Sequence, residues 1–335
     1  MESLCSVKLL FPSFSELRYN SYKKKQSMFK EKNVVIQLDT KTVYSFMDSL
    51  IPIKKYVQKA KGLGYSHLGM MDVDNLYGAY HFLEEAESAG LQPLLGLELS
   101  LIKAEQELHL RLLALDSQGY RNLMKVSTLK MMGQKNWEDF QHLFKGLAVI
   151  VPAFDGVADL DLGLDFYVGV FPATPQQEFG RPTLPLHTVR YFDRGDLETL
   201  QMLRAIRENA SLREIGSLPN HEFLLAPDAL AGAFKETFPE SLANLEKLVR
   251  DVHYDINREL KLPRFNRERP AVEELRERSE AGLKKRGLTG KLYQERLDQE
   301  LDVIHQMSFD DYFLIVWDLL RFGRSQGYYM GMGRG

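Results

Sequence analysis

The sequence is poor in the residues that build disulfides and zinc sites. It contains one cysteine, Cys5, and eight histidines, and no two histidines stand at the spacing of metal ligands. One cysteine excludes an internal disulfide framework and a cysteine-rich zinc site, and it is typical of a protein in the reducing cytoplasm. The composition therefore predicts a cytoplasmic protein.

Long apolar runs and a surplus of one charge are also missing. No run approaches the ~18 residues that a membrane helix needs, and residues 1–27 lack the pattern of a signal peptide, so we expect no membrane contact. With 46 acidic and 43 basic residues, the net charge is -3. A chain that binds nucleic acid usually has more basic than acidic residues. Either nucleic acid is not the partner, or the basic surface lies outside these 335 residues.

The first half of the chain alternates between strand and helix patterns. Residues 1–33 read as a disordered leader in which Met28 is an alternative start. Strands and helices alternate from Val34 onward, and PLHTVRYF at 185–192 is the last strand pattern. Apolar residues at helical spacing over 52–63 and 78–89 end at Gly64 and Gly90. This alternation predicts a parallel α/β sheet or barrel with helices outside, and a site at the C-terminal ends of the strands.

The second half reads as mainly helical. After residue 195 helical patterns dominate, KLPRFNRERP reads as a linker, and a charge-rich helix pattern with Glu274 and Arg278 four residues apart follows. The chain closes on an apolar helix and the glycine turn Gly333-Arg334-Gly335, whose backbone amides and guanidinium suit a phosphate. We predict three parts: a leader at 1–33, a barrel with a helical connection at 34–265, and a further domain from 266 to 335.

Carboxylates gather at the expected strand ends. They are Asp39, Asp48, Asp72, Asp74 and Glu98. Clustered carboxylates hold divalent cations, and two such cations can activate water for phosphoester cleavage. The alternative is that these residues form turns and helix N-caps, and spacing alone leaves both readings open.

Several stretches resemble a known family. LGYSHLGMMDVDNLYGAYHFLEEAESAGLQPLLGLEL and GYRNLMKVST resemble the PHP (polymerase and histidinol phosphatase) domain, in the form found at the N-terminus of bacterial DNA polymerase III alpha subunits. FDDYFLIVWDLLRFGRSQGYYMGMGRG resembles the start of the polymerase palm in those subunits, where a glycine loop holds the nucleotide triphosphate. The resemblance implies a distorted PHP-type (βα)7 barrel followed by a mainly helical segment, with 266–335 as the start of the palm.

The metal-ligand positions of the PHP family are largely changed here. The family's His-x-His pair falls on Asp39 and Lys41, and its closing Asp-x-His pair falls on Thr188 and Arg190. A histidine position falls on Val73 and a cysteine or histidine position on Ala153, whereas Asp72 and Glu98 are kept and Asp48 can still bind. Because Lys41 and Arg190 would repel a cation and pair with the remaining carboxylates, the resemblance implies a remnant site without metal: Asp39, Lys41, Asp48, Asp72, Glu98 and Arg190.

The resemblance also implies a function. The parent protein would be a DNA-directed DNA polymerase that uses dNTPs and Mg²⁺, with the magnesium ligands outside this chain. Its partners would be DNA and other replisome subunits such as the sliding clamp. This chain would have a structural role and would not polymerise by itself. Two alternatives stay open: a metal-dependent phosphoesterase or 3′–5′ exonuclease, and an interaction module unrelated to a polymerase.

Overall fold

Two units make up the protein. The computed structural model describes residues 36–256 and 262–331, so the predicted leader and the turn at Gly333-Arg334-Gly335 lie outside the described residues. The chain divides into the units Met1–Ile256 and Asn257–Gly335. The boundaries predicted at residues 33 and 265 stay predictions.

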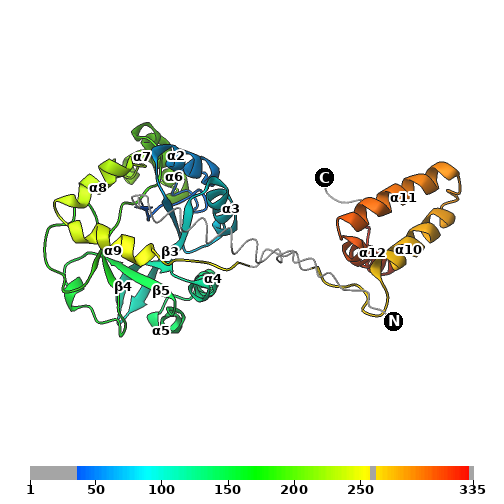
Figure 1. Ribbon diagram of the computed structural model, residues 1–335, viewed down its shortest axis with the longest axis horizontal. Coiled ribbons are helices and arrows are strands. Elements are labelled where there is room, and N and C mark those ends of the chain that lie inside the picture. Colours follow the sequence, from blue (N-terminus) through cyan, green and yellow to red (C-terminus); the bar gives the residue numbers. More distant parts are fainter. Residues whose placement is uncertain (1–35, 257–261, 332–335) are drawn as a thin grey trace, which may run out of the picture. The chain divides into compact units, whose positions relative to one another are not determined.

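One curled sheet forms the centre of the first unit (Figure 1). Its seven strands lie side by side in chain order: β1 (Ile36–Gln37), β2 (His67–Val73), β3 (Gln92–Lys103), β4 (Gln106–Ala114), β5 (Leu147–Pro152), β6 (Tyr167–Val170) and β7 (Thr183–Pro185). The two edges meet at an isolated parallel bridge between Thr40 and Val189. The α/β PHP-type architecture predicted from the sequence is confirmed.

The expectation of a parallel sheet is wrong at one strand. β4 runs antiparallel to both β3 and β5, while the other neighbours are parallel. Ala104 and Glu105 join β3 to β4, and both have positive φ, which suits a two-residue hairpin turn. Neither residue is the glycine or asparagine that signals such a turn, so the pattern did not reveal the hairpin.

The last predicted strand is also shorter than expected. A strand pattern covers 185–192, but β7 ends at Pro185 and only isolated bridges at Val189 and Tyr191 follow. The Tyr191 bridge joins Phe223, outside the sheet. This segment therefore closes the sheet through single bridges, because its last backbone hydrogen bond to β6 is the one from Leu186 N to Val170 O.

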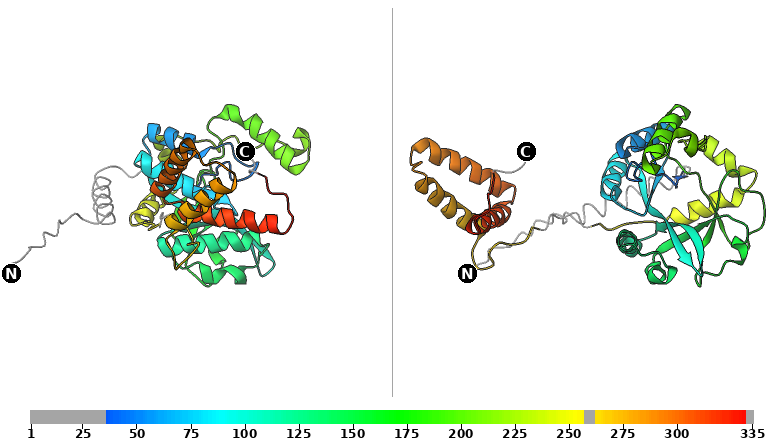
Figure 2. Two further views of the ribbon diagram at one scale, coloured as in Figure 1. Left: turned by 90° about the vertical axis from the view of Figure 1, so that its right-hand side faces the viewer. Right: turned by 180° about the vertical axis from the view of Figure 1, so that it is seen from behind.

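Helices cover the sheet in the first unit (Figure 2). They are α2 (Ile53–Leu63), α3 (Ala79–Ala89), α4 (Ser117–Met131), α5 (Trp137–Phe140), α6 (Leu197–Glu208), α7 (Leu212–Ile215), α8 (Pro227–Lys235) and α9 (Pro239–Val249). As predicted, α2 and α3 end at Gly64 and Gly90, whose φ values of 93° and 77° lie in the left-handed region.

Strand residues alternate between two apolar cores. Leu95, Leu97 and Leu99 of β3 pack in the core that includes α2, α3 and α4. Leu94 of β3 and Ile150 of β5 point to the opposite side, where α9 contributes. This period of two is the ordinary pleat of a strand, and it places helices on one side of the sheet and α9 against the other.

The second unit consists of three described helices. They are α10 (Ala271–Lys285), α11 (Lys291–Gln306) and α12 (Asp310–Ser325), around a small core of Leu275, Leu301 and Leu314. Glu274 pairs with Arg278, as their spacing predicts, and the guanidinium of Arg278 lies 4.0 Å from the ring centre of Trp317. Within the described residues, no helix is long and apolar enough to cross a bilayer.

Candidate functional site at the mouth of the barrel

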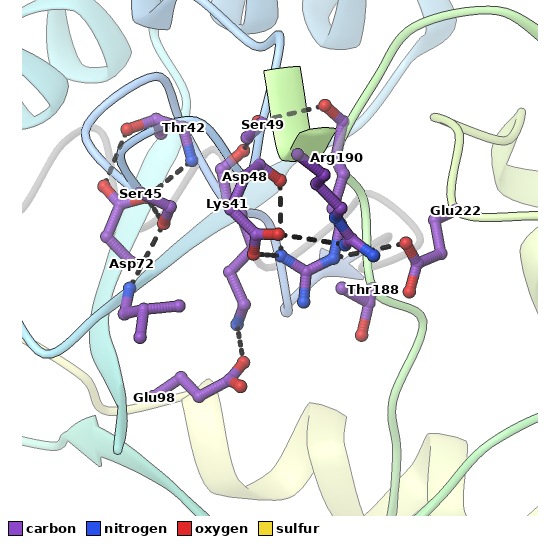
Figure 3. Close-up of polar contacts among 12 residues, drawn as sticks. Lys41, Thr42, Ser45, Asp48, Ser49, Asp72, Glu98, Thr188, Arg190 and Glu222 are labelled. Atoms are coloured by element: carbon purple, nitrogen blue, oxygen red, sulfur yellow. Dashed lines mark hydrogen bonds and ion pairs between the residues drawn. The ribbon is translucent and has the colours of Figure 1, made fainter. Parts of the chain in front are cut away.

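Most of the predicted site residues lie at one end of the curled sheet, which we call the mouth (Figure 3). Asp39 follows β1, Asp72 lies near the end of β2, and Glu98 of β3 is in register with Val73. The loop from Thr40 to Ser49 crosses this end and is anchored to the segment after β7, because Lys41 N donates to Val189 O and Leu50 N donates to Arg190 O.

Lys41 is the centre of the first cluster. Its side chain is fully buried, and its ammonium lies 2.5 Å from Asp39 Oδ1 and 2.6 Å from Glu98 Oε2. Arg111 of β4 reaches the same carboxylates, with Nε 3.3 Å from Asp39 and Nη2 3.0 Å from Glu98. Thr188 Oγ1 donates to Asp39 Oδ2 at 2.7 Å. Two cations therefore face two carboxylates in a closed, neutral group.

These contacts determine the protonation state of Asp39 and Glu98. Burial by itself raises the pKa of Asp39, but the charges of Lys41 and Arg111 outweigh it and hold that pKa far below its ordinary value. The pKa of Glu98 is likewise lowered, because the same two cations outweigh the effect of burial. Both carboxylates are thus ionised at neutral pH and paired with fixed cations.

Asp48 is the centre of a second cluster. Its carboxylate pairs with Arg190, lies 2.9 Å from Arg204 Nη2 and lies 3.3 Å from Arg207 Nη1. Arg190 Nε also lies 3.2 Å from Glu222 Oε2. Arg204 and Arg207 belong to α6, so Asp48 links the loop at the mouth, the segment after β7 and a helix more than one hundred residues further along the chain.

Asp72 forms a third cluster without a cation in contact. Its carboxylate accepts hydrogen bonds from Thr42 N, Thr42 Oγ1 and Ser45 Oγ, each at 2.6 Å. Burial nevertheless raises the pKa of Asp72, with these hydrogen bonds opposing the rise. The two oxygens of Asp72 thus hold the loop from Thr40 to Ser49 in place as hydrogen-bond acceptors. The neutral side chain of asparagine, which has one such oxygen, can partly replace them.

We expect Asp72→Asn to change the free energy of unfolding at pH 7 by less than about 1 kcal/mol. The native pKa of Asp72 is raised, so ionisation costs stability as pH rises through that pKa, and asparagine removes this cost while keeping an acceptor for the loop. Urea unfolding between pH 5 and pH 8 measures the effect. A loss several times larger at pH 7 would mean that the charge itself is required.

The structure brings together the six predicted remnant residues in these three clusters. Val73 is the last residue of β2 and Ala153 directly follows β5, and neither has a polar side chain, whereas Asp74 pairs with Lys130 at 3.5 Å. The sequence reasoning missed four charged residues, which are Arg111, Arg204, Arg207 and Glu222. The only signal for Arg111 is that a charge stands inside the apolar run LHLRLLAL, and its position opposite Glu98 depends on the hairpin register, which the sequence pattern does not reveal.

Comparison with known protein families assigns a domain type to each part of the chain. Residues 37–175 match the PHP domain, which agrees with the curled seven-stranded sheet. Residues 273–335 match the bacterial DNA polymerase III alpha NTPase domain. A solved structure of a candidate metal-dependent phosphoesterase from Bifidobacterium adolescentis covers 53% of this chain and 85% of that chain, with 13% identity and a TM-score of 0.32.

Similar full-length proteins identify the family more specifically than these domain matches do. The chain is 50% identical to DNA polymerase III subunit alpha of Streptococcus pyogenes serotype M1 over 301 residues, which are 89% of this chain and 29% of that protein. It is 27% identical to the subunit alpha of Bacillus subtilis over 342 residues, 90% of this chain and 31% of that protein. This chain carries the N-terminal PHP region of bacterial DNA polymerase III alpha subunits and spans less than a third of their length.

The donors at the mouth do not fit the metal cluster that PHP domains hold. An ion between Asp39 and Glu98 would meet the ammonium of Lys41, which lies within 2.6 Å of both carboxylates, and like charges at such distances repel strongly. Asp72 has its oxygens directed to hydroxyl and amide donors. In the part of the chain that the structure describes, no three His, Cys, Asp or Glu side chains are grouped to hold an ion.

Proposed function

We propose that this PHP domain has a structural role in a replicative DNA polymerase and does not hydrolyse phosphoesters. The observation that carries the proposal is the fully buried ammonium of Lys41, 2.5 Å from Asp39 and 2.6 Å from Glu98. A fixed cation relieves the repulsion between two buried carboxylates, which is the task that a metal ion performs in a metal-dependent site.

The arrangement also lacks the chemistry of a hydrolase. Hydrolysis of a phosphoester at a two-metal site needs an activated water and a cation facing the leaving oxygen. Here the carboxylates that would hold such cations are paired with Lys41, Arg111 and Arg190. The ion pairs attach the loop from Thr40 to Ser49 and helix α6 to the barrel. This is a structural role.

The parent protein, in this proposal, is a DNA-directed DNA polymerase. The support is the match of residues 273–335 to the polymerase III alpha family and the 50% identity to the streptococcal subunit. Its substrates are dNTPs and template DNA, its cofactor is Mg²⁺ held outside these residues, and its partners are replisome subunits such as the sliding clamp. The 335 residues alone do not polymerise.

Metal analysis tests the proposal directly. We expect purified protein, incubated with Zn²⁺ or Mn²⁺ and then dialysed, to retain well below one equivalent of either metal. Excess metal should leave Tm unchanged, because a ligand that binds the native state raises it. Labelled single-stranded DNA should stay intact under the same conditions.

The alternative functions predict different results. A metal-dependent phosphoesterase or exonuclease requires stoichiometric metal after dialysis together with metal-dependent cleavage, and that pair of results would overturn the proposal. EDTA-treated protein is the control in each assay. Retained metal without cleavage would overturn only the metal-free part and leave the structural role in place.

A further inference from the structure

Several large exposed apolar side chains of the first unit lie in segments beside the mouth, and others, Met202, Ile206 and Leu212, lie on α6 and α7. Between residues 36 and 200 they occur only in the loop at 43–46, at 77–80 and in 124–132. Phe46 is 73% exposed, Tyr77 is 68% exposed and Met132 is 70% exposed. We call Tyr44, Phe46, Tyr77, Met131 and Met132 the aromatic–methionine surface.

Hydrogen bonds and packing connect these segments into one surface. Asn75 Nδ2 donates to Tyr44 O at 2.9 Å, and the ring of Tyr44 packs so close to Gly78 that a Cβ there would lie 2.6 Å from it. Tyr77 Oη lies 3.3 Å from Met131 Sδ at the end of α4. The loop after β1, the connection after β2 and helix α4 therefore contact one another at this end of the barrel.

Helix α4, which borders this surface, and the turn that follows it carry basic but no acidic side chains. From Ser117 to Trp137 the sequence has four cations, Arg121, Lys125, Lys130 and Lys135, and no Asp or Glu. Lys125 and Lys135 are exposed, whereas Lys130 is partly buried and pairs with the nearby carboxylate of Asp74. The charge on α4 and the turn after it thus favours an anionic partner, in contrast to the slightly acidic chain as a whole.

We propose that the aromatic–methionine surface with its basic rim binds single-stranded DNA. Exposed aromatic rings stack on bases without regard to sequence, and neighbouring cations contact the phosphates. Exposed tyrosine and phenylalanine rings favour unpaired strands over duplex, because the bases of a duplex are already stacked. This inference rests on the surface alone and holds whether or not the mouth binds metal.

Fluorescence anisotropy of the full chain with a fluorescein-labelled oligothymidylate of about 20 nucleotides tests the inference. We expect saturable binding at about 50 mM salt, with weaker binding to a duplex of the same length. Tyr77→Ala should weaken binding about tenfold, because it removes one stacking partner. Lys125→Glu combined with Lys135→Glu should lower the salt dependence by about 1.4 in log–log slope, at about 0.7 for each phosphate that is no longer neutralised.

Matched controls lie on the second unit. Lys284→Glu combined with Lys285→Glu makes the same charge change at exposed positions of α10, and Tyr293→Ala removes a tyrosine of α11 that is 48% exposed. We expect both controls to bind as the unchanged chain does. Circular dichroism establishes that each variant is folded before it is compared.

The outcomes separate this inference from its rivals. No binding at low salt overturns it, as does equal binding to duplex or an equal loss in the controls, since these indicate general electrostatic attraction. Absent DNA binding together with self-association that Tyr77→Ala abolishes would assign the surface to a protein partner. None of these results bears on the metal content, so failure here and failure of the proposed function can be told apart.

Discussion

Replacing Lys41 with methionine should lower the free energy of unfolding at pH 7 by about 3–5 kcal/mol. The ammonium of Lys41 is fully buried and contacts both Asp39 and Glu98. Without it, the buried carboxylate of Asp39 and the partly buried carboxylate of Glu98 share the single guanidinium of Arg111, and one negative charge is left uncompensated. Urea unfolding, followed by circular dichroism, measures the difference.

The effect of this substitution should depend on pH in a defined direction. Because the native pKa values of Asp39 and Glu98 are lowered, their contribution to stability is full above their unfolded values near 4 and is lost as pH falls through the native ones. Without Lys41 these native pKa values rise. The difference between the two proteins should therefore shrink as pH falls toward 4.

A matched control distinguishes the stability lost with a buried ion pair from the stability lost with an exposed one. Lys59→Met removes an ammonium that lies 3.0 Å from Asp193, with side chains 38% and 76% exposed. An exposed pair of this kind contributes about 0–1 kcal/mol. If Lys41→Met costs no more than Lys59→Met, the cluster at the mouth does not stabilise the barrel as we infer.

Replacing Asp48 with asparagine should cost about 3 kcal/mol and loosen helix α6. Asp48 contacts Arg190, Arg204 and Arg207, of which Arg190 is largely buried. Loss of the carboxylate leaves three guanidinium groups facing one another, with Glu222 as the remaining partner of Arg190. Hydrogen exchange should then be faster for the amides of α6, while α3 stays protected.

Two further variants sharpen this second test. Asp318→Asn removes an exposed carboxylate that pairs with Arg321 at 2.7 Å, and it should change stability by less than about 1 kcal/mol. Adding Arg190→Gln to Asp48→Asn should recover part of the loss, because it removes one of the three guanidinium groups that then repel one another. Unchanged exchange in α6 after Asp48→Asn would show that its arginines do not anchor the helix.

Much of the local structure could be predicted from the sequence because its causes are local. Helical periodicity and a glycine at the left-handed position defined the ends of α2 and α3 at Gly64 and Gly90. The apolar runs defined most of the strands, and the spacing of Glu274 and Arg278 predicted an ion pair within one helix. Each of these features depends on residues within a few positions of one another.

The sequence by itself also determined the family, and through the order of the family's motifs it indicated six of the residues that meet at the mouth. The tertiary structure alone decided how those residues pair. The hairpin after β3 reverses β4 and sets Arg111 against Glu98, and the fold brings Arg204 and Arg207 to Asp48. The physical reason is distance along the chain: charge pairs between remote residues depend on strand direction and on the closure between Thr40 and Val189, which no local pattern encodes.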